Sequence, residues 1–262
     1  MADRATVSLE QDRCSVRVHR GTNPPVEERA GPWATRFSDF AILSAIVYRN
    51  DGDDLQPPPG WTPSPDALDK FDDPKTSLYF EVWENISKNP CEVVVVFRGT
   101  QELKDWWTNA RWITRFIPTG WDQYNLTREE IGKVADRARK RHGEVRMMTV
   151  GHSLGGGLAQ QAAYAHPDIK QVFAFDSSPV TGFQNVPEPA RTRYKAGIVI
   201  ERIFEHGEIL AYARTFMRQF LPLSERDPVI TEIRFNLSKG DAVTQHSMVD
   251  LANRMVKAAK DC

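Results

Sequence analysis

The feature that most constrains the fold is the segment 147–157, where an apolar run leads into a serine between glycines and then into a helix-forming stretch. Gly151 and Gly155 stand two residues before and two residues after Ser153. A serine on a sharp strand-to-helix turn has a strained backbone, and its neighbours at these positions must be small so that strand and helix can approach each other. The segment therefore predicts a strand, a tight turn that presents a serine, and a helix.

The pattern Gly-x-Ser-x-Gly alone is common, so its flanks decide how it is interpreted. Residues 144–150 are mostly β-branched or apolar, and residues 155–166 are rich in Ala, Leu and Gln, as a strand and a helix require. Ser is also a preferred N-cap residue, so a serine that only caps the helix is the alternative. A phosphate-binding loop is disfavoured, because no Lys follows the glycines. We interpret Ser153 as a nucleophile.

The rest of the chain alternates between strand-like and helix-like segments. We expect strands at residues 15–19, 77–86, 91–97, 144–150, 171–175, 198–204 and 229–237, and helices at residues 37–48, 126–141, 155–166, 209–221 and 248–259. This alternation predicts an α/β fold with a mostly parallel sheet and helices on both faces. With 262 residues and 40% hydrophobic side chains, we expect a polar N-terminal arm (1–30) and a single α/β domain (31–262).

Charge and cysteine content limit partners and compartment. The net charge is −1, so a nucleic-acid partner is not expected. Cys14, Cys91 and Cys262 are widely spaced and odd in number, which argues against a disulfide framework. The sequence contains no apolar run of membrane-spanning length, and its first residues have no apolar stretch behind a basic start, so we expect neither a transmembrane segment nor a signal peptide. We expect a protein that is cytoplasmic as synthesised, with signal-independent secretion as a further option.

A general base for Ser153 has to come later in the chain, because this architecture usually has the order Ser, acid, His. His246 follows the last expected strand and starts the last expected helix, which is where a base belongs. His166 ends the helix after the nucleophile and is expected to cap it. His152 adjoins Ser153 and is expected to pack the elbow.

The acid has three candidates. Glu205 and Glu208 both follow the expected strand 198–204, and Asp176 follows the expected strand before it. Any of them can hydrogen-bond the second ring nitrogen of the base, fix its tautomer and stabilise the imidazolium. An alternative for Asp176 is a turn that caps Ser177 and Ser178.

Three segments together resemble the class 3 lipase family of the α/β-hydrolase fold. They are residues 95–100 (Val-Val-Phe-Arg-Gly-Thr) with Asp105 and Trp106, residues 151–156 (Gly-His-Ser-Leu-Gly-Gly), and residues 246–248 (His-Ser-Met). The resemblance covers residues 37–260. It implies Ser153 as nucleophile and His246 as base, with Thr100 and the Leu154 backbone N–H as oxyanion donors. It also places Glu208 where the family has its acid, which is more often Asp.

The same resemblance bears on the lid and the acyl site. Only a short segment separates Trp106 from residues 119–121, where many family members carry a helical lid, which argues against interfacial activation of the fungal kind. Residues 211–221 combine basic and apolar side chains and suit either a lipid surface or a core helix. Several aromatic and apolar side chains line an acyl pocket or serve as plain packing: Trp106, Trp107, Trp112, Phe116 and Ile117.

Together these residues predict a serine hydrolase that cleaves carboxylic esters of lipids, or small esters, by two-step acyl transfer. No cofactor and no metal site is expected. Peripheral contact with a membrane surface is compatible with residues 211–221, and nothing in the sequence indicates an oligomeric state. The alternative is a catalytically silent hydrolase-fold module that binds a ligand or a partner.

Overall fold

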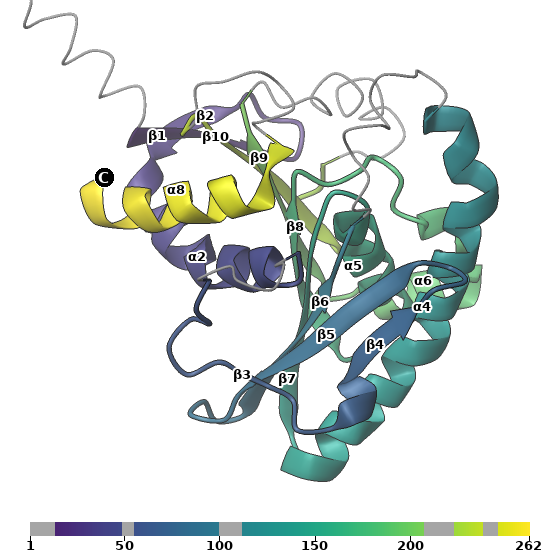
Figure 1. Ribbon diagram of the computed structural model, residues 1–262. Coiled ribbons are helices and arrows are strands. Elements are labelled where there is room, and N and C mark those ends of the chain that lie inside the picture. The colour runs from purple at the N-terminus through teal and green to yellow at the C-terminus, as the bar shows by residue number, and fades with distance from the viewer. Residues whose placement is uncertain (1–13, 49–54, 100–111, 207–222, 238–245) are drawn as a thin grey trace, which may run out of the picture.

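The computed structural model describes residues 14–48, 55–99, 112–206, 223–237 and 246–262 of the chain, with residues 112–121 described as backbone only. Its centre is a ten-stranded sheet with the order β2-β1-β10-β9-β8-β7-β6-β5-β3, and β4 pairs with β5 beside this path (Figure 1). Five neighbouring strands are parallel: β6 (Cys91–Phe97), β7 (Val145–His152), β8 (Ile169–Phe175), β9 (Val199–Glu205) and β10 (Val229–Phe235). Their carboxyl ends meet at one edge, where open α/β sheets bind ligands.

Antiparallel strands complete the sheet on both sides. β5 (Leu78–Asn85) pairs with β6, and β3 (Thr62–Pro63) and β4 (Lys70–Asp73) pair with β5. On the other side, β1 (Ser15–Arg20) pairs with β10 and β2 (Val26–Arg29) pairs with β1. The strand expected at residues 15–19 therefore belongs to the main sheet, where it is the second strand from the edge because β2 lies outside it. The division of the chain at residue 30 stays a prediction.

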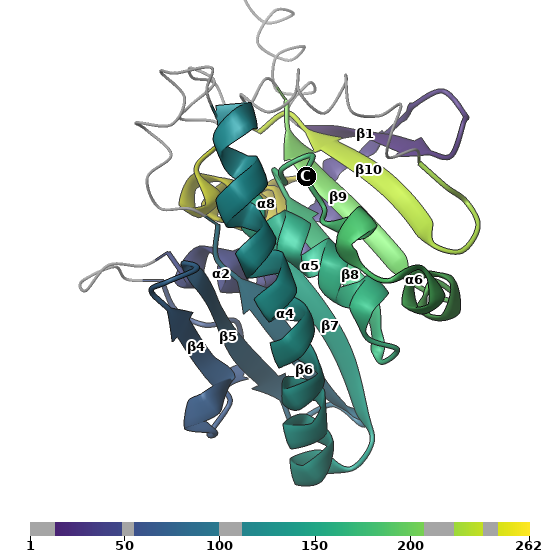
Figure 2. The same ribbon diagram turned by 90° about the vertical axis from the view of Figure 1, so that its right-hand side faces the viewer.

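Helices cover both faces of the sheet (Figures 1 and 2). α2 (Ala30–Ile46) and α8 (Met248–Asp261) pack in one apolar cluster with Val94 and Val96 of β6. α4 (Trp112–His142) and α5 (Leu154–Ala165) pack in a second cluster with Val93 and Val95. Because successive strand residues point to opposite faces, the valine run of β6 serves both cores. The short α6 (Glu188–Tyr194) adds Ala190 to the second cluster.

Two helices begin earlier than the sequence pattern suggests. α2 starts at Ala30 instead of residue 37, and its Pro32 falls in the first turn, where a missing N–H costs nothing. α4 starts at Trp112 and continues through Pro118 and Gly120, residues that normally indicate a break. The helix expected at residues 209–221 lies outside the described residues. No helix in the described part of the chain is both long enough and apolar enough to cross a membrane.

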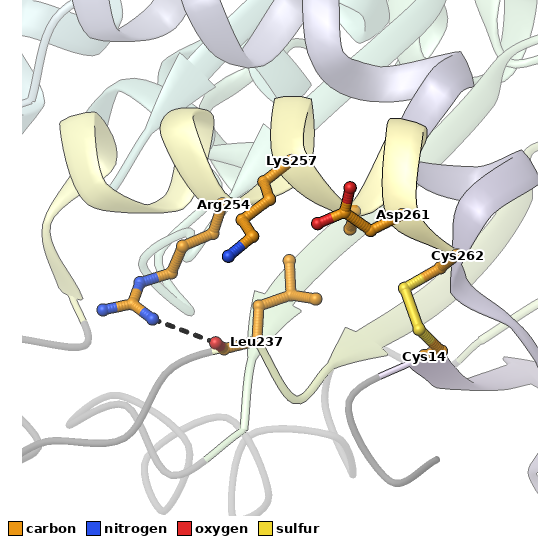
Figure 3. A pocket seen from close by; sticks show the side chains of 7 residues that line it. Cys14, Leu237, Arg254, Lys257, Asp261 and Cys262 are labelled. Atoms are coloured by element: carbon orange, nitrogen blue, oxygen red, sulfur yellow. Dashed lines mark hydrogen bonds between the residues drawn. A yellow bond between two sulfur atoms is a disulfide. The ribbon is translucent and has the colours of Figure 1, made fainter. Parts of the chain in front are cut away.

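A disulfide joins Cys14 to Cys262 across 248 residues, with the two Cα atoms 5.2 Å apart (Figure 3). It borders a surface pocket of about 400 Å³, in which Arg254 donates a hydrogen bond to the Leu237 carbonyl. Cys91 is buried and unbridged. The cysteine count and spacing argue against a disulfide framework, and this expectation is wrong for Cys14 and Cys262. Spacing along the chain could not show this pairing, because it depends on β1 and the end of α8 meeting in the folded protein.

Candidate active site

Ser153 sits on a nucleophile elbow between β7 and α5. Its backbone has φ 56° and ψ −124°, a region that residues other than glycine rarely occupy. A Cβ atom at Gly151 would lie 2.2 Å from the Gly155 carbonyl oxygen, and one at Gly155 would lie 2.3 Å from the Phe97 carbonyl oxygen. These contacts confirm the requirement for small residues on both sides of the serine. The strand, turn and helix expected from the sequence are all present.

The backbone of Ser153 is held from three directions. Its N–H donates to the Phe175 carbonyl at 3.0 Å, and its carbonyl accepts from Gly156 at 3.1 Å and from Ser178 at 2.8 Å. Within the described residues, its hydroxyl makes no capping hydrogen bond to α5, although Ser153 is the N-cap residue. A serine retained only to cap the helix would make that bond. The strained backbone of Ser153 instead presents its hydroxyl at the turn.

His246 lies beside the elbow. Its ring centroid is 4.6 Å from that of His152, the residue immediately before Ser153, and both histidines are buried. The hydroxyl of Ser247 accepts a hydrogen bond from the Asp250 N–H and so fixes the start of α8 directly after His246. The structure therefore brings the expected base against His152, the residue before the expected nucleophile, from more than 90 residues away in the sequence.

Asp176 is the carboxylate that joins this group. One of its oxygens, one ring nitrogen of His152 and one ring nitrogen of His246 all lie within 4.8 Å of one another. Asp176 is fully buried at the end of β8, with φ 37°. Its backbone N–H donates to the Ile203 carbonyl at 2.8 Å, and its Oδ1 accepts from the Glu205 N–H at 2.9 Å. These two bonds to β9 hold the carboxylate in place.

The other two acid candidates differ from Asp176. Glu205 is buried at the end of β9, and its Oε1 accepts from the Leu237 N–H at 2.8 Å, so it anchors the chain after β10. Glu208 lies outside the described residues. In the sequence no local motif marks Asp176 as the acid, because it follows the strand before β9 and not β9 itself.

The end of β6 runs directly past the nucleophile. A Cβ atom at Gly99 would lie 3.1 Å from the Ser153 Cβ and 2.8 Å from the His152 carbonyl oxygen. Thr100, Trp106 and Trp107 lie outside the described residues, as does the side chain of Phe116. Leu154 is the first residue of α5, so its backbone N–H has no partner within the helix by position. The oxyanion assignment to Thr100 and Leu154 remains a prediction.

Tyr48 is a neighbour of the site that the sequence analysis did not single out. Its hydroxyl accepts the Gly99 N–H at 2.6 Å and lies 3.2 Å from Nδ1 of His152. Desolvation raises the pKa of Tyr48 above its ordinary range, so the phenol stays protonated. In the sequence Tyr48 was only the last residue of an amphipathic helix, and no spacing signal marked it.

Comparisons with solved structures show the fold. Lipase II of Rhizopus niveus is 16% identical, with a TM-score of 0.50 over 77% of this chain and 79% of its own. The triacylglycerol lipase of Penicillium expansum is 14% identical, with a TM-score of 0.52 over 82% of this chain and 89% of its own. Both similarities confirm the α/β-hydrolase fold expected from the sequence.

Comparisons of sequence show the family. The extracellular phospholipase A1 of Serratia liquefaciens is 36% identical over 90 residues, which are 34% of this chain. The matched region spans 25% of the length of that relative. The family model described as a phospholipase-like, Tle-like phospholipase domain matches residues 39–259. Since that match includes most of the chain, with the elbow, Asp176 and His246, the protein belongs to the Tle-like phospholipase domain family.

Proposed function

We propose that the protein cleaves carboxylic esters of lipids, with Ser153 as the nucleophile. The observation that carries this proposal is the strained elbow serine, whose hydroxyl does not cap its helix, directly after His152, which forms a buried group with His246 and Asp176. Two imidazoles and a carboxylate are also suitable ligands for a transition metal. A metal site has no need of a strained serine next to it, so the geometry favours the hydrolase.

The reaction has two acyl-transfer steps. Ser153 Oγ attacks the ester carbonyl while His246 takes its proton, and the oxyanion is stabilised by the N–H of Leu154 and by Thr100. The intermediate collapses as the C–O bond to the alcohol breaks, and His246 returns the proton to the departing alcohol. Water then attacks the acyl-enzyme with His246 as base, which frees the carboxylic acid and restores the Ser153 hydroxyl.

We assign the acid of the triad to Asp176. Its carboxylate lies with the two histidines and is held by the backbone of β9. A buried, preoriented carboxylate stabilises the imidazolium that forms when His246 takes the serine proton. Glu208 is the competing candidate, because the resemblance to class 3 lipases places it where that family has its acid. A Glu208→Gln variant tests it separately.

Phospholipid is the substrate that we propose. The family model carries the phospholipase description, and the relative from Serratia is named a phospholipase A1. Peripheral contact with the lipid surface through residues 211–221 is part of the same proposal. We further propose that the protein works in an oxidising compartment, because disulfides such as Cys14–Cys262 persist there and are reduced in the cytosol.

The test is fatty-acid release from phosphatidylethanolamine and phosphatidylcholine vesicles by the purified chain. Ser153→Ala should lower the rate by at least about 10³-fold, because it removes the nucleophile. Ser38→Ala removes a hydroxyl that donates to the Thr35 carbonyl of its own helix and should leave the rate unchanged. Equal rates for Ser153→Ala and the unaltered chain would refute the proposal. No turnover of vesicles or of short soluble esters would favour the silent binding module.

A further inference from the structure

We infer that Tyr48 is a positioning residue: its hydroxyl joins the end of β6 at Gly99 to the nucleophile elbow at His152 and so aligns the oxyanion donors with Ser153. This inference rests on the proposed ester hydrolysis. It gives a role at the site to a residue just after α2, a helix that packs in the first apolar cluster on one face of the sheet.

Three chain segments meet at the Tyr48 hydroxyl. Tyr48 follows α2, and its N–H donates to the Ala45 carbonyl at 3.0 Å, which fixes its backbone. The hydroxyl accepts the Gly99 N–H at 2.6 Å and lies 3.3 Å from the His152 carbonyl oxygen and 3.2 Å from His152 Nδ1. The two rings meet edge to face, with centroids 5.5 Å apart. One phenol thus accepts from Gly99, just after β6, and donates its single proton to the elbow.

Gly99, Tyr48 and Ser153 are closely packed. A Cβ atom at Gly99 would lie 2.6 Å from the Tyr48 hydroxyl and 3.1 Å from the Ser153 Cβ. Gly99 immediately precedes Thr100, the expected side-chain oxyanion donor. If the hydroxyl is removed, the Gly99 N–H loses its partner in a confined place, which is costly. The backbone is then expected to shift towards another acceptor and to carry residue 100 with it.

Such a shift affects the transition state more than the bound substrate. A misplacement of about 1 Å can cost about 10²-fold in rate, and oxyanion donors act on charge that develops only during the reaction. Loss of the Tyr48 hydroxyl should therefore lower kcat and leave KM nearly constant. A merely structural role would lower thermal stability without this separation of kcat from KM.

The experiment compares Tyr48→Phe with Tyr124→Phe on a short soluble ester. Tyr124 is a matched control, because it is buried and its hydroxyl donates to the Val180 carbonyl at 2.5 Å, whereas the Tyr48 hydroxyl accepts from Gly99. We expect Tyr48→Phe to reduce kcat by about 10- to 100-fold with KM changed less than about threefold. We also expect a slower reaction of Ser153 with a fluorophosphonate. Equal kcat values for the two variants, after correction for the folded fraction, would overturn the inference.

If Tyr48→Phe does not fold, a second pair of variants tests the positioning role of Tyr48. His152→Asn keeps an acceptor near the position of Nδ1, and His152→Ala removes it. We expect the Asn variant to retain much more of kcat than the Ala variant, and equal losses would contradict the role of Tyr48. Ser153→Ala separates this inference from the proposed function: if that variant keeps full turnover, ester hydrolysis at Ser153 is wrong and the role of Tyr48 falls with it.

Discussion

At the scale of single residues, the identity of the acid is the sharpest question. Asp176→Asn keeps nearly the same shape, and Asn also tolerates the positive φ of this position. Its amide oxygen can still accept the Glu205 N–H, but it carries no charge to stabilise the imidazolium of His246. We expect kcat to fall by about 10³- to 10⁴-fold with little change in melting temperature.

Matched variants at the other two acids complete this prediction. Glu205→Gln retains an acceptor for the Leu237 N–H and should leave kcat within about threefold. Glu208→Gln should behave in the same way if Asp176 is the acid. A large loss of kcat in Glu208→Gln, with Asp176→Asn nearly unaffected, would move the acid to Glu208 and refute the assignment made here.

The contrast among site residues shows how much of the site the sequence can predict. Ser153 is marked by a local steric pattern, and His246 by its place after the last strand. The acid is different, because carboxylates after two neighbouring strands reach the same edge of the sheet and only the fold decides which one meets the base. No sequence pattern indicates Tyr48, because its proposed role depends on the contact between the end of the first helix region and Gly99 in the folded protein.

At the scale of elements, the elbow depends on the close approach of α5 to β6. In Gly155→Ala the new Cβ would meet the Phe97 carbonyl, which is backbone and cannot rotate away. We expect a loss of about 1–3 kcal/mol in the free energy of unfolding, measured by urea denaturation, together with slower fluorophosphonate labelling.

Gly132→Ala is the matched control for this change. Gly132 lies within α4, and an added Cβ would approach nothing closer than a His166 ring atom at 3.9 Å. Replacing a helical glycine by alanine there should raise the free energy of unfolding by up to about 1 kcal/mol and leave labelling unchanged. Destabilisation of both variants to the same extent would contradict the steric account of the elbow.

The central elements follow from sequence pattern and the peripheral ones do not. The valine run of β6 is buried on both faces, so its composition alone predicts a central parallel strand. β2, β3 and β4 are short and largely exposed at the sheet edges, so they carry no hydrophobic alternation. α4 runs through Pro118 and Gly120, residues that indicate a break in the sequence, whereas its described apolar contacts begin at Tyr124.

At the scale of the whole molecule, the Cys14–Cys262 disulfide links β1 to the end of α8, the helix that begins just after His246. A bridge that closes 248 residues restricts the unfolded chain strongly. The chain-entropy model gives an upper figure of about 5 kcal/mol for a loop of this size. We expect reduction, or Cys14→Ser, to lower the melting temperature clearly.

The control for this prediction is to treat the Cys14→Ser variant with the same reducing agent. The Cys14→Ser variant should not respond further to it, because Cys91 is unbridged. Identical melting temperatures for oxidised and reduced protein would show that the bridge contributes nothing to stability. They would also remove the structural support for the proposed oxidising compartment.

The central claim is that Ser153 is a nucleophile activated by His246. The most direct test is to treat the purified, oxidised protein with a fluorophosphonate and to map the adduct by mass spectrometry, since only an activated serine reacts quickly. We predict rapid modification at Ser153 and at least about 10²-fold slower modification in His246→Ala. Modification at another serine, or equal rates with and without His246, would contradict the account.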